Sequence, residues 1–168
     1  PELYSTKIAV SEDEKKVYQC EINHSGEDFL LFENNIEQLP FRRDAIVDRL
    51  RKDGINLKSI KFVASEGGLL KPCQSGVYQI DKNMIGDLID GIGGNDIINL
   101  GGMIAFTIAN SLNVKSFLVE PSSVDERSDL AAFTPNISLK KKSLFHTLHH
   151  KYLVRKYAKS VNKNYEDI

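Results

Sequence analysis

Two short apolar runs bracket a helical pattern, and this order restricts the fold more than any other feature. The first run, 60–64, does not alternate cleanly between apolar and polar residues, which predicts a strand buried on both faces. Over 97–112, leucine and isoleucine recur every four residues, as in a mostly buried helix. The second run, 116–119, completes a strand–helix–strand order, which favours parallel strands joined by a right-handed crossover. The sequence therefore predicts an α/β domain.

Further elements can be placed around this unit. Residues 6–10 and 16–22 are β-branched and aromatic runs separated by an acidic turn, which predicts a hairpin. Residues 41–52 follow an amphipathic helix pattern in which Arg42 falls on the polar side, and His24 follows the hairpin as an expected surface residue. The remaining predictions are helical turns over 33–39 separated by Pro40 from the next helix, an edge-like strand over 77–80, and helices over 82–90 (capped by Asp81), 125–132 and 142–161.

Composition narrows the class of protein. A length of 168 residues suits one domain, and 41% apolar with 27% charged residues is ordinary for a globular chain. A net charge of −1 gives no overall field for nucleic acid or an anionic membrane, and the basic C-terminal fifth is interpreted as a solvated helix face. Cys20 and Cys73 lack metal or redox spacing, and no signal or membrane-spanning run is present, so we expect a reduced, cytoplasmic setting.

Chemistry cannot be assigned from the residues alone. No P-loop, dinucleotide fingerprint, metalloprotease motif or nucleophile elbow occurs. The four histidines do not stand at metal-ligand spacing from cysteines or carboxylates, so no metal site is predicted. The pairs Gly67–Gly68 and Gly101–Gly102 fit either backbone approach to a phosphate or tight turns and close helix packing, and both interpretations stay open.

Five segments in order resemble the butyrate kinase branch of the acetate kinase family, and together they cover nearly the whole chain. They are 5–10, 41–46, 67–72 (G-G-L-L-K-P), 99–102 (N-L-G-G), and 143–146 with 155–159. The resemblance implies a mixed sheet flanked by helices, the ribonuclease-H-like or actin-like ATPase first domain. In that family two halves clamp ATP and Mg²⁺, and a phosphoryl group passes to a short-chain carboxylate.

The resemblance also divides the chain. Residues 1–138 are expected to form the butyrate-kinase-like N-terminal domain, and 139–168 a C-terminal amphipathic helix leading toward a second domain absent from this sequence. Most of the adenosine site is expected in that second half, so independent binding of ATP is not expected. The family's first strand is also absent from this sequence.

The resemblance places ten positions at the site. The catalytic positions are Glu120 and His146, with Glu66 and Asp96 standing where the family has arginine and histidine; the substrate- or phosphate-facing positions are Ser5, Thr6, Lys7, Gly67, Gly68 and Asn99. An arginine offsets charge on a transferring phosphoryl group, so Glu66 reverses the required sign. Glu120 keeps a carboxylate. His146 is either a retained phosphate contact or a packed helix residue.

Two functional hypotheses follow. The first is a catalytically impaired relative, a pseudoenzyme descended from a carboxylate phosphotransferase. The second is a non-catalytic half-kinase that pairs with itself or with a separately encoded second half. Neither hypothesis involves nucleic acid or a membrane.

Overall fold

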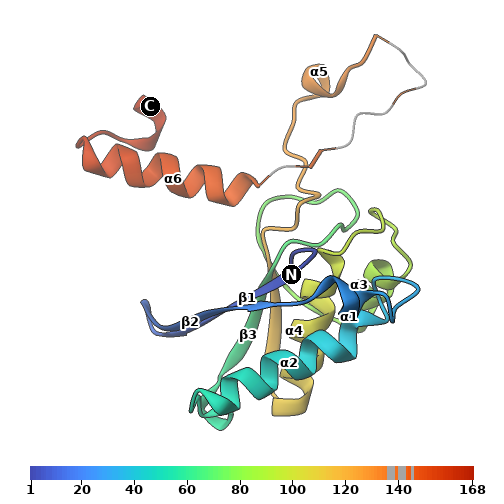
Figure 1. The fold of residues 1–168 in the computed structure, drawn as a ribbon. Coiled ribbons are helices and arrows are strands. Elements are labelled where there is room, and N and C mark those ends of the chain that lie inside the picture. The colour runs from blue at the N-terminus through green and yellow to red at the C-terminus, as the bar shows by residue number, and fades with distance from the viewer. Residues whose placement is uncertain (136–138, 140–142, 145) are drawn as a thin grey trace.

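The computed structural model describes residues 1–135, 139, 143–144 and 146–168, and it has the predicted α/β order (Figure 1). The elements are β1 (Ser5–Glu12), β2 (Lys15–Asn23), α1 (Gly26–Phe29), α2 (Gln38–Lys52), η1 (Leu57–Ser59), β3 (Phe62–Glu66), β4 (Val77–Gln79), α3 (Lys82–Ile89), α4 (Asn99–Leu112), β5 (Lys115–Val119), α5 (Asp129–Ala132), α6 (Thr147–Ser160) and η2 (Tyr165–Asp167). Among the described residues, no helix is long and apolar enough to cross a bilayer.

The main sheet has three strands in the order β3-β5-β4. Strands β3 and β5 run parallel, with Glu66 opposite Val119 at their carboxyl ends, whereas β4 runs antiparallel to β5. The predicted parallel pairing is therefore confirmed, and the sheet is mixed. The prediction that the first apolar run is buried on both faces is wrong: β5 takes the central place, and Phe62 at the start of β3 is 60% exposed.

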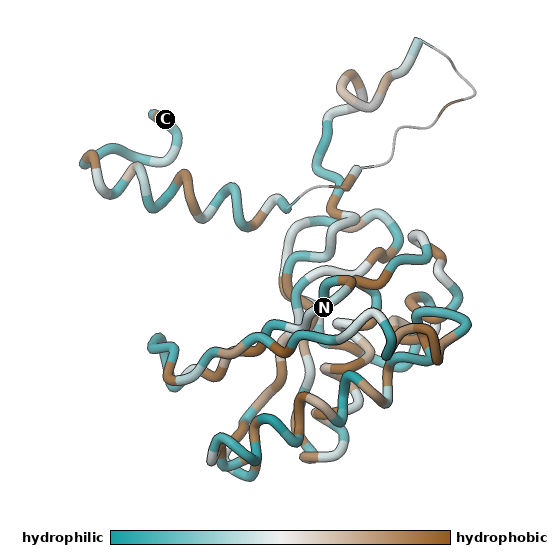
Figure 2. The backbone as a smooth tube through the Cα atoms, viewed as in Figure 1, coloured by the Kyte–Doolittle hydropathy of each residue, from teal (hydrophilic) through white to brown (hydrophobic). Residues whose placement is uncertain are grey.

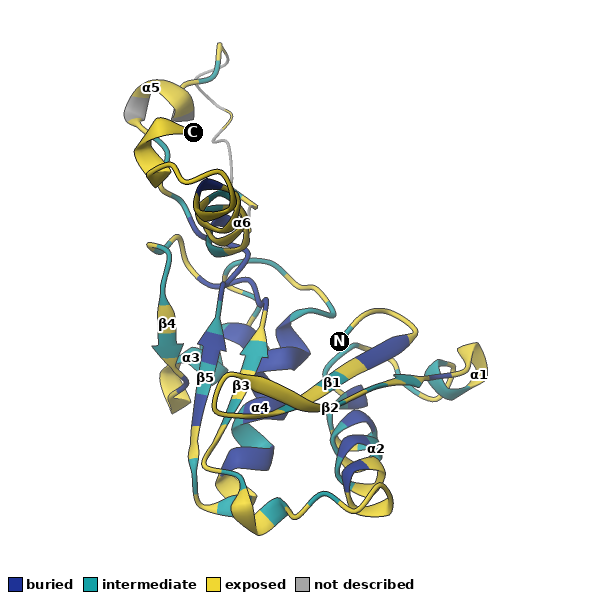
Figure 3. Ribbon diagram, turned by 90° about the vertical axis from the view of Figure 1, so that its left-hand side faces the viewer, coloured by how far each residue is buried: buried dark blue, intermediate teal, exposed yellow. Residues whose placement is uncertain are grey.

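Helix α4 forms the core because it packs against β3, β5, α2 and α3 (Figure 1). Its buried face carries Leu100, Met103, Ile104 and Ile108, which surround the fully buried Leu118 of β5. Burying such a side chain contributes roughly 1.5 to 3 kcal/mol of hydrophobic free energy. Figure 3 shows this concentration of buried residues along α4 and β5. The prediction of a mostly buried helix is confirmed.

Helix α2 corrects two predictions. It begins at Gln38, so Pro40 lies inside its first turn instead of separating two helical segments. Proline is tolerated there because the backbone N–H of a first-turn residue has no helical acceptor. Arg42, expected on the polar face, is completely buried on the same side as Ile46 and Leu50. Tertiary hydrogen bonds, which periodicity does not report, place its guanidinium inside.

The hairpin of β1 and β2 is confirmed, but the surface position expected for His24 is wrong. The His24 imidazole is buried, and its Nε2 lies 3.0 Å from the Thr6 hydroxyl. The rings of Phe29 and Phe41 pack against it, with centroids 5.8 Å and 5.3 Å from that of the imidazole. Burial, with a smaller contribution from the charge of Arg42, lowers the pKa of His24. His24 therefore joins the hairpin to α2.

The C-terminal part differs from its predicted helices. Only Asp129–Ala132 of the segment 125–132 is helical, and the helix predicted over 142–161 begins at Thr147. Residues 136–138, 140–142 and 145 lie outside the described residues, and they include the predicted start of the last helix at 142. The division of the chain into a domain over 1–138 and a C-terminal helix over 139–168 stays a prediction. Figures 1 and 2 show α6 apart from the layered body, with apolar and polar residues interleaved along it.

Candidate functional site

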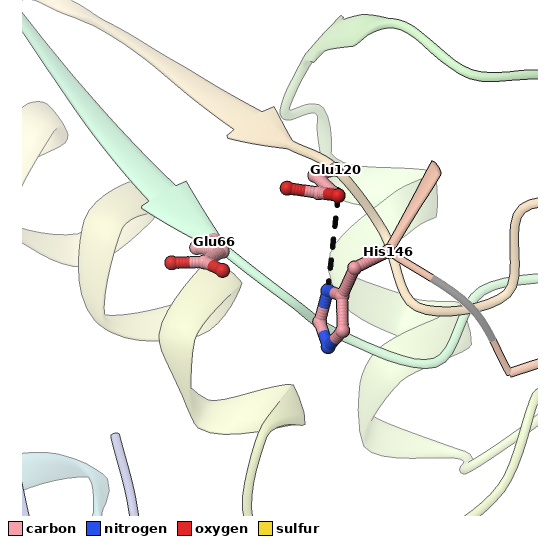
Figure 4. Close-up of side chains that lie close together, drawn as sticks. All are labelled: Glu66, Glu120 and His146. Atoms are coloured by element: carbon pink, nitrogen blue, oxygen red, sulfur yellow. Dashed lines mark ion pairs between the residues drawn. The ribbon is translucent and has the colours of Figure 1, made fainter. Parts of the chain in front are cut away.

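Three side chains from distant parts of the sequence meet where the parallel strands end. Glu66 is the last residue of β3, Glu120 directly follows β5, and His146 directly precedes α6. One ligand atom from each lies within 4.8 Å of the other two (Figure 4). Parallel strands bring their carboxyl ends to one edge of a sheet, so the pairing of β3 with β5 places the two glutamates together.

Glu120 is the buried member of this group. Its Oε1 accepts a hydrogen bond of 2.8 Å from the backbone N–H of His149, in the first turn of α6. A carboxylate is favourable there because unpaired N–H groups give a helix N-terminus a partial positive charge. The backbone of Glu120 has φ of 55°, which is uncommon for a residue other than glycine. The turn after β5 thus aims the carboxylate at α6.

Glu66 and His146 form the open side of the group. The His146 side chain is 52% exposed, against 9% for Glu120, and its Nδ1 lies 3.9 Å from Glu120 Oε1. Glu66 is exposed and, among the described residues, makes no ion pair with a lysine or arginine. Two carboxylates and one imidazole therefore border a solvent-accessible space, and the positive groups that would balance them are few.

Sequence reasoning missed this arrangement as a ligand set. The three residues are far apart in the chain, so a search for metal-ligand spacing in the sequence finds nothing, although the fold brings one imidazole and two carboxylates together. The available signal was topological: two acidic residues at the ends of two parallel strands. The predicted catalytic roles of Glu66, Glu120 and His146 stay predictions.

The predicted glycines shape the turn after β3. Gly67 and Gly68 are buried, with φ of 85° and 94°. These values lie in the left-handed region that only glycine adopts readily, so a conformational requirement accounts for both residues. Gly93, in the second glycine-rich turn, packs so closely that an added Cβ would lie 2.4 Å from the carbonyl oxygens of Leu69 and Leu70. The two turns therefore support each other.

Asn99 links these two turns from the interior. Its Oδ1 accepts a hydrogen bond of 2.8 Å from the backbone N–H of Leu69, and its Nδ2 donates to the carbonyl oxygen of Gly94 at 2.8 Å. The same Nδ2 lies 3.4 Å from the carbonyl oxygen of Leu88. The amide is buried and occupied by backbone groups. Its predicted role in facing a ligand stays a prediction.

The N-terminal turn holds three predicted phosphate-facing residues. Ser5 and Thr6 are buried, and the Thr6 hydroxyl also accepts a hydrogen bond of 3.1 Å from Arg42. Lys7 is exposed and forms an ion pair of 2.6 Å with Glu2. The lysine that the resemblance placed in this turn is thus paired with an adjacent carboxylate. Contact of these residues with phosphate stays a prediction.

Asp96 lies outside the three-residue group. It is exposed, and its Oδ1 accepts a hydrogen bond of 3.0 Å from the backbone N–H of Ile98. Its carbonyl oxygen accepts from Asn99, at the start of α4. This is the local turn that aspartate commonly makes with its own backbone. Asp96 therefore forms the turn that precedes α4. A catalytic role for this residue stays a prediction.

Together these features define the class of protein: an α/β domain of the actin-like ATPase type, with acidic groups beyond two parallel strands. No family model matches the chain. It is 38% identical to butyrate kinase 1 and 39% identical to butyrate kinase 2 of Clostridium acetobutylicum, each over 168 residues. These alignments cover the whole chain but only 47% of each relative. The chain is butyrate-kinase-like, and the resemblance carried by the five segments is confirmed.

Proposed function

We propose that this chain is a butyrate-kinase-like domain of a carboxylate phosphotransferase, and that its own capacity for catalysis is impaired. Its relatives are named as butyrate kinases. The reaction proposed for a complete protein is transfer of the γ-phosphoryl group of ATP to a short-chain carboxylate, which gives an acyl phosphate. The chain spans about half the length of these relatives, so the activity, its substrates and its Mg²⁺ belong to this proposal.

The observation that carries the proposal is the position of Glu66. Its carboxylate borders the same space as Glu120 and His146. A transferring phosphoryl group is negative, as is the carboxylate that accepts it, so a second carboxylate there repels both. The resemblance places an arginine at this position. Loss of one donor to a developing charge costs about 3 to 4 kcal/mol, or 10² to 10³ in rate, and reversal of the charge costs more.

The two remaining residues supply part of the required chemistry. Glu120 is held by α6 and keeps a fixed direction, so it can orient a substrate or contribute to a Mg²⁺ site through oxygen. His146 can donate a proton or a hydrogen bond to a phosphate oxygen from its exposed ring. Mg²⁺ prefers oxygen ligands, and the two glutamates fit that preference better than the imidazole does. The magnesium ion would supply charge neutralisation for the phosphates.

An acyl-phosphate trapping assay tests the proposal. Purified chain is incubated with ATP, Mg²⁺, butyrate and hydroxylamine, and the hydroxamate is measured. No turnover is expected, and steady formation of hydroxamate would overturn the claim of impairment. A binding titration with butyryl phosphate compares the native chain with Glu66→Arg and with Glu14→Arg, an exposed control in the hairpin turn. Affinity is expected to rise about tenfold only in Glu66→Arg, and equal affinities would count against the proposed site.

A second function is favoured by one further observation. Helix α6 carries the exposed apolar residues Tyr152, Leu153 and Tyr157, and Val161 follows it. Large exposed apolar groups along one helix are typical of an interaction surface. The chain would then act as a non-catalytic module that pairs with itself or with a separate second half. Light scattering after size exclusion tests the self-pairing form, since a monomer at high concentration contradicts it.

A further inference from the structure

The group Glu66, Glu120 and His146 has the composition of a metal site. It offers two carboxylate oxygens and one imidazole nitrogen from three separate segments. Divalent metal ions are often bound by three protein ligands, with water completing the coordination. Two members lie on ordered elements, because Glu66 ends a paired strand and Glu120 is hydrogen-bonded to the first turn of α6. Two of the three ligands are thus held in place by the fold, unlike carboxylates that only happen to lie near one another on a surface.

The buried carboxylate supplies an independent reason to expect a cation. The side chain of Glu120 is nine-tenths buried, and its Oε1 receives the hydrogen bond from His149. No hydrogen bond between described residues reaches its Oε2. Figure 4 shows this oxygen on the side of the carboxylate that faces Glu66. This oxygen is not fully enclosed, because every enclosed side-chain oxygen of the described residues has a hydrogen-bond partner. A carboxylate that is nine-tenths buried beside a second carboxylate is still unfavourable unless a positive group lies between them.

No lysine or arginine of the described residues fills that role, although the N-terminal amine of Pro1 interacts electrostatically with Glu66. Among the described residues, the ion pair at this group is the 3.9 Å approach of His146 to Glu120, and neither glutamate is paired with a lysine or arginine. His146 is neutral when it acts as a metal ligand, so it then contributes a lone pair instead of a charge. A divalent ion between the three side chains would balance both carboxylates at once.

We propose that Glu66, Glu120 and His146 bind a divalent transition-metal ion of the zinc class, with water in the remaining coordination positions. Ligand atoms around tetrahedral zinc stand about 3.3 Å apart, given bonds of about 2.0 Å. The three atoms here lie within 4.8 Å, and both Glu66 and His146 are exposed and able to rotate inward. The closure needed is therefore small and involves the two exposed side chains, while Glu120 stays in place.

The donor set distinguishes zinc from magnesium. Imidazole nitrogen is a common ligand of zinc, whereas magnesium prefers an octahedron of oxygen atoms. Affinity of a nitrogen and oxygen site also rises along the first-row series from manganese to copper and falls again at zinc, which still binds more tightly than manganese. The expected order is Zn²⁺ above Mn²⁺ above Mg²⁺. The proposal uses the same three residues as the proposed phosphotransferase site but does not depend on that function, because the ligand set holds whether or not the chain takes part in phosphoryl transfer.

Zinc affinity tests the proposal directly. The native chain competes with a chromophoric chelator for Zn²⁺, and one equivalent is expected to bind. Glu66→Gln and His146→Ala are each expected to weaken binding at least tenfold, because each removes a ligand. Both positions are exposed, and circular dichroism checks that the variants remain folded. Native-like zinc affinity in both variants would overturn the proposal, as would Mg²⁺ binding as tightly as Zn²⁺.

Matched controls separate this site from adventitious binding by other residues. Glu14→Gln removes an exposed glutamate elsewhere, and His149→Ala with His150→Ala removes the two neighbouring imidazoles while keeping the backbone N–H that bonds Glu120. Both controls are expected to bind zinc like the native chain. X-ray absorption is expected to show one imidazole in the zinc shell. Loss of binding in the double histidine variant, or two imidazoles in the shell, would refute the assignment. The acyl-phosphate assay does not affect either outcome.

Discussion

Replacement of Arg42 by alanine gives the sharpest test of the structure. The guanidinium is fully buried, and its hydrogen-bond partners are all neutral. They are Gln38 Oε1 at 3.0 Å, the Ser5 carbonyl oxygen at 3.2 Å, the Thr6 hydroxyl at 3.1 Å and the Leu3 carbonyl oxygen at 2.7 Å. The group also lies 5.0 Å from the centre of the Phe29 ring. Burial lowers the pKa of Arg42 from its usual value.

The expected loss of stability in Arg42→Ala depends on which hydrogen-bond partners of Arg42 keep another donor. The Ser5 carbonyl oxygen retains a donor in Glu2, and the Thr6 hydroxyl retains His24. The Leu3 carbonyl oxygen loses its donor but belongs to a residue that is half exposed, whereas Gln38 Oε1 is left buried without a partner. That penalty is about 1 to 3 kcal/mol, and truncation of a buried long side chain adds roughly 2 or more. Release of the buried charge offsets part of this sum. The expected net loss for Arg42→Ala is about 3 kcal/mol.

Urea unfolding followed by far-ultraviolet circular dichroism measures this loss, because the chain contains no tryptophan. Arg51→Ala is the matched control: Arg51 lies on the exposed side of the same helix, with a long 3.7 Å ion pair to Asp48. It should change stability by no more than about 0.5 kcal/mol. Arg42→Met, which keeps much of the volume, should fall between the two. Equal stability of Arg42→Ala and Arg51→Ala would refute the buried network.

Gly93→Ala should destabilise the fold by about 2 to 4 kcal/mol, because its Cβ would overlap backbone carbonyl oxygens that cannot move freely. Gly86→Ala, in α3 with open space around its Cβ, should instead stabilise by about 0.5 to 1 kcal/mol; urea midpoints that fail to separate the two would contradict the packing. Hydrogen bonds from Lys151 and then Ser75 hold the pKa of the Glu126 carboxyl at about 2, below its usual 4.5. The folded-state pKa is depressed, so this link contributes fully above about pH 4.5 and is lost as pH falls toward 2. Hydrogen exchange in α6 should rise over that window, more so in the native chain than in Glu126→Gln.

Local sequence determined the elements that depend on interactions between residues close together in the chain. The hairpin, the Asp81-capped α3 and the buried α4 all appear where the pattern predicted them. Each depends on periodicity, a turn or a cap, and these involve residues only a few positions apart. The order of the two apolar runs around α4 likewise predicted the parallel pair. The five family-like segments also carried a resemblance that the comparison with butyrate kinases confirmed.

Tertiary structure alone decided the positions of Arg42 and His24. Both look like surface residues by pattern, yet both are buried, because their partners come from elements far away along the chain. The exposure of β3 had the same origin: strand order, not composition, put β5 in the centre of the sheet. Similarly, Pro40 enters α2 because the helix begins earlier than its apolar stripe indicates.

The sequence named the residues of the candidate site but not their geometry. Glu66, Glu120 and His146 were each expected at the site by resemblance, separately and in different roles. Their meeting within 4.8 Å depends on the register of β3 with β5 and on the start of α6, which no local spacing encodes. Electrostatic interaction depends on distance in space, so the two glutamates and the imidazole interact only once the chain is folded.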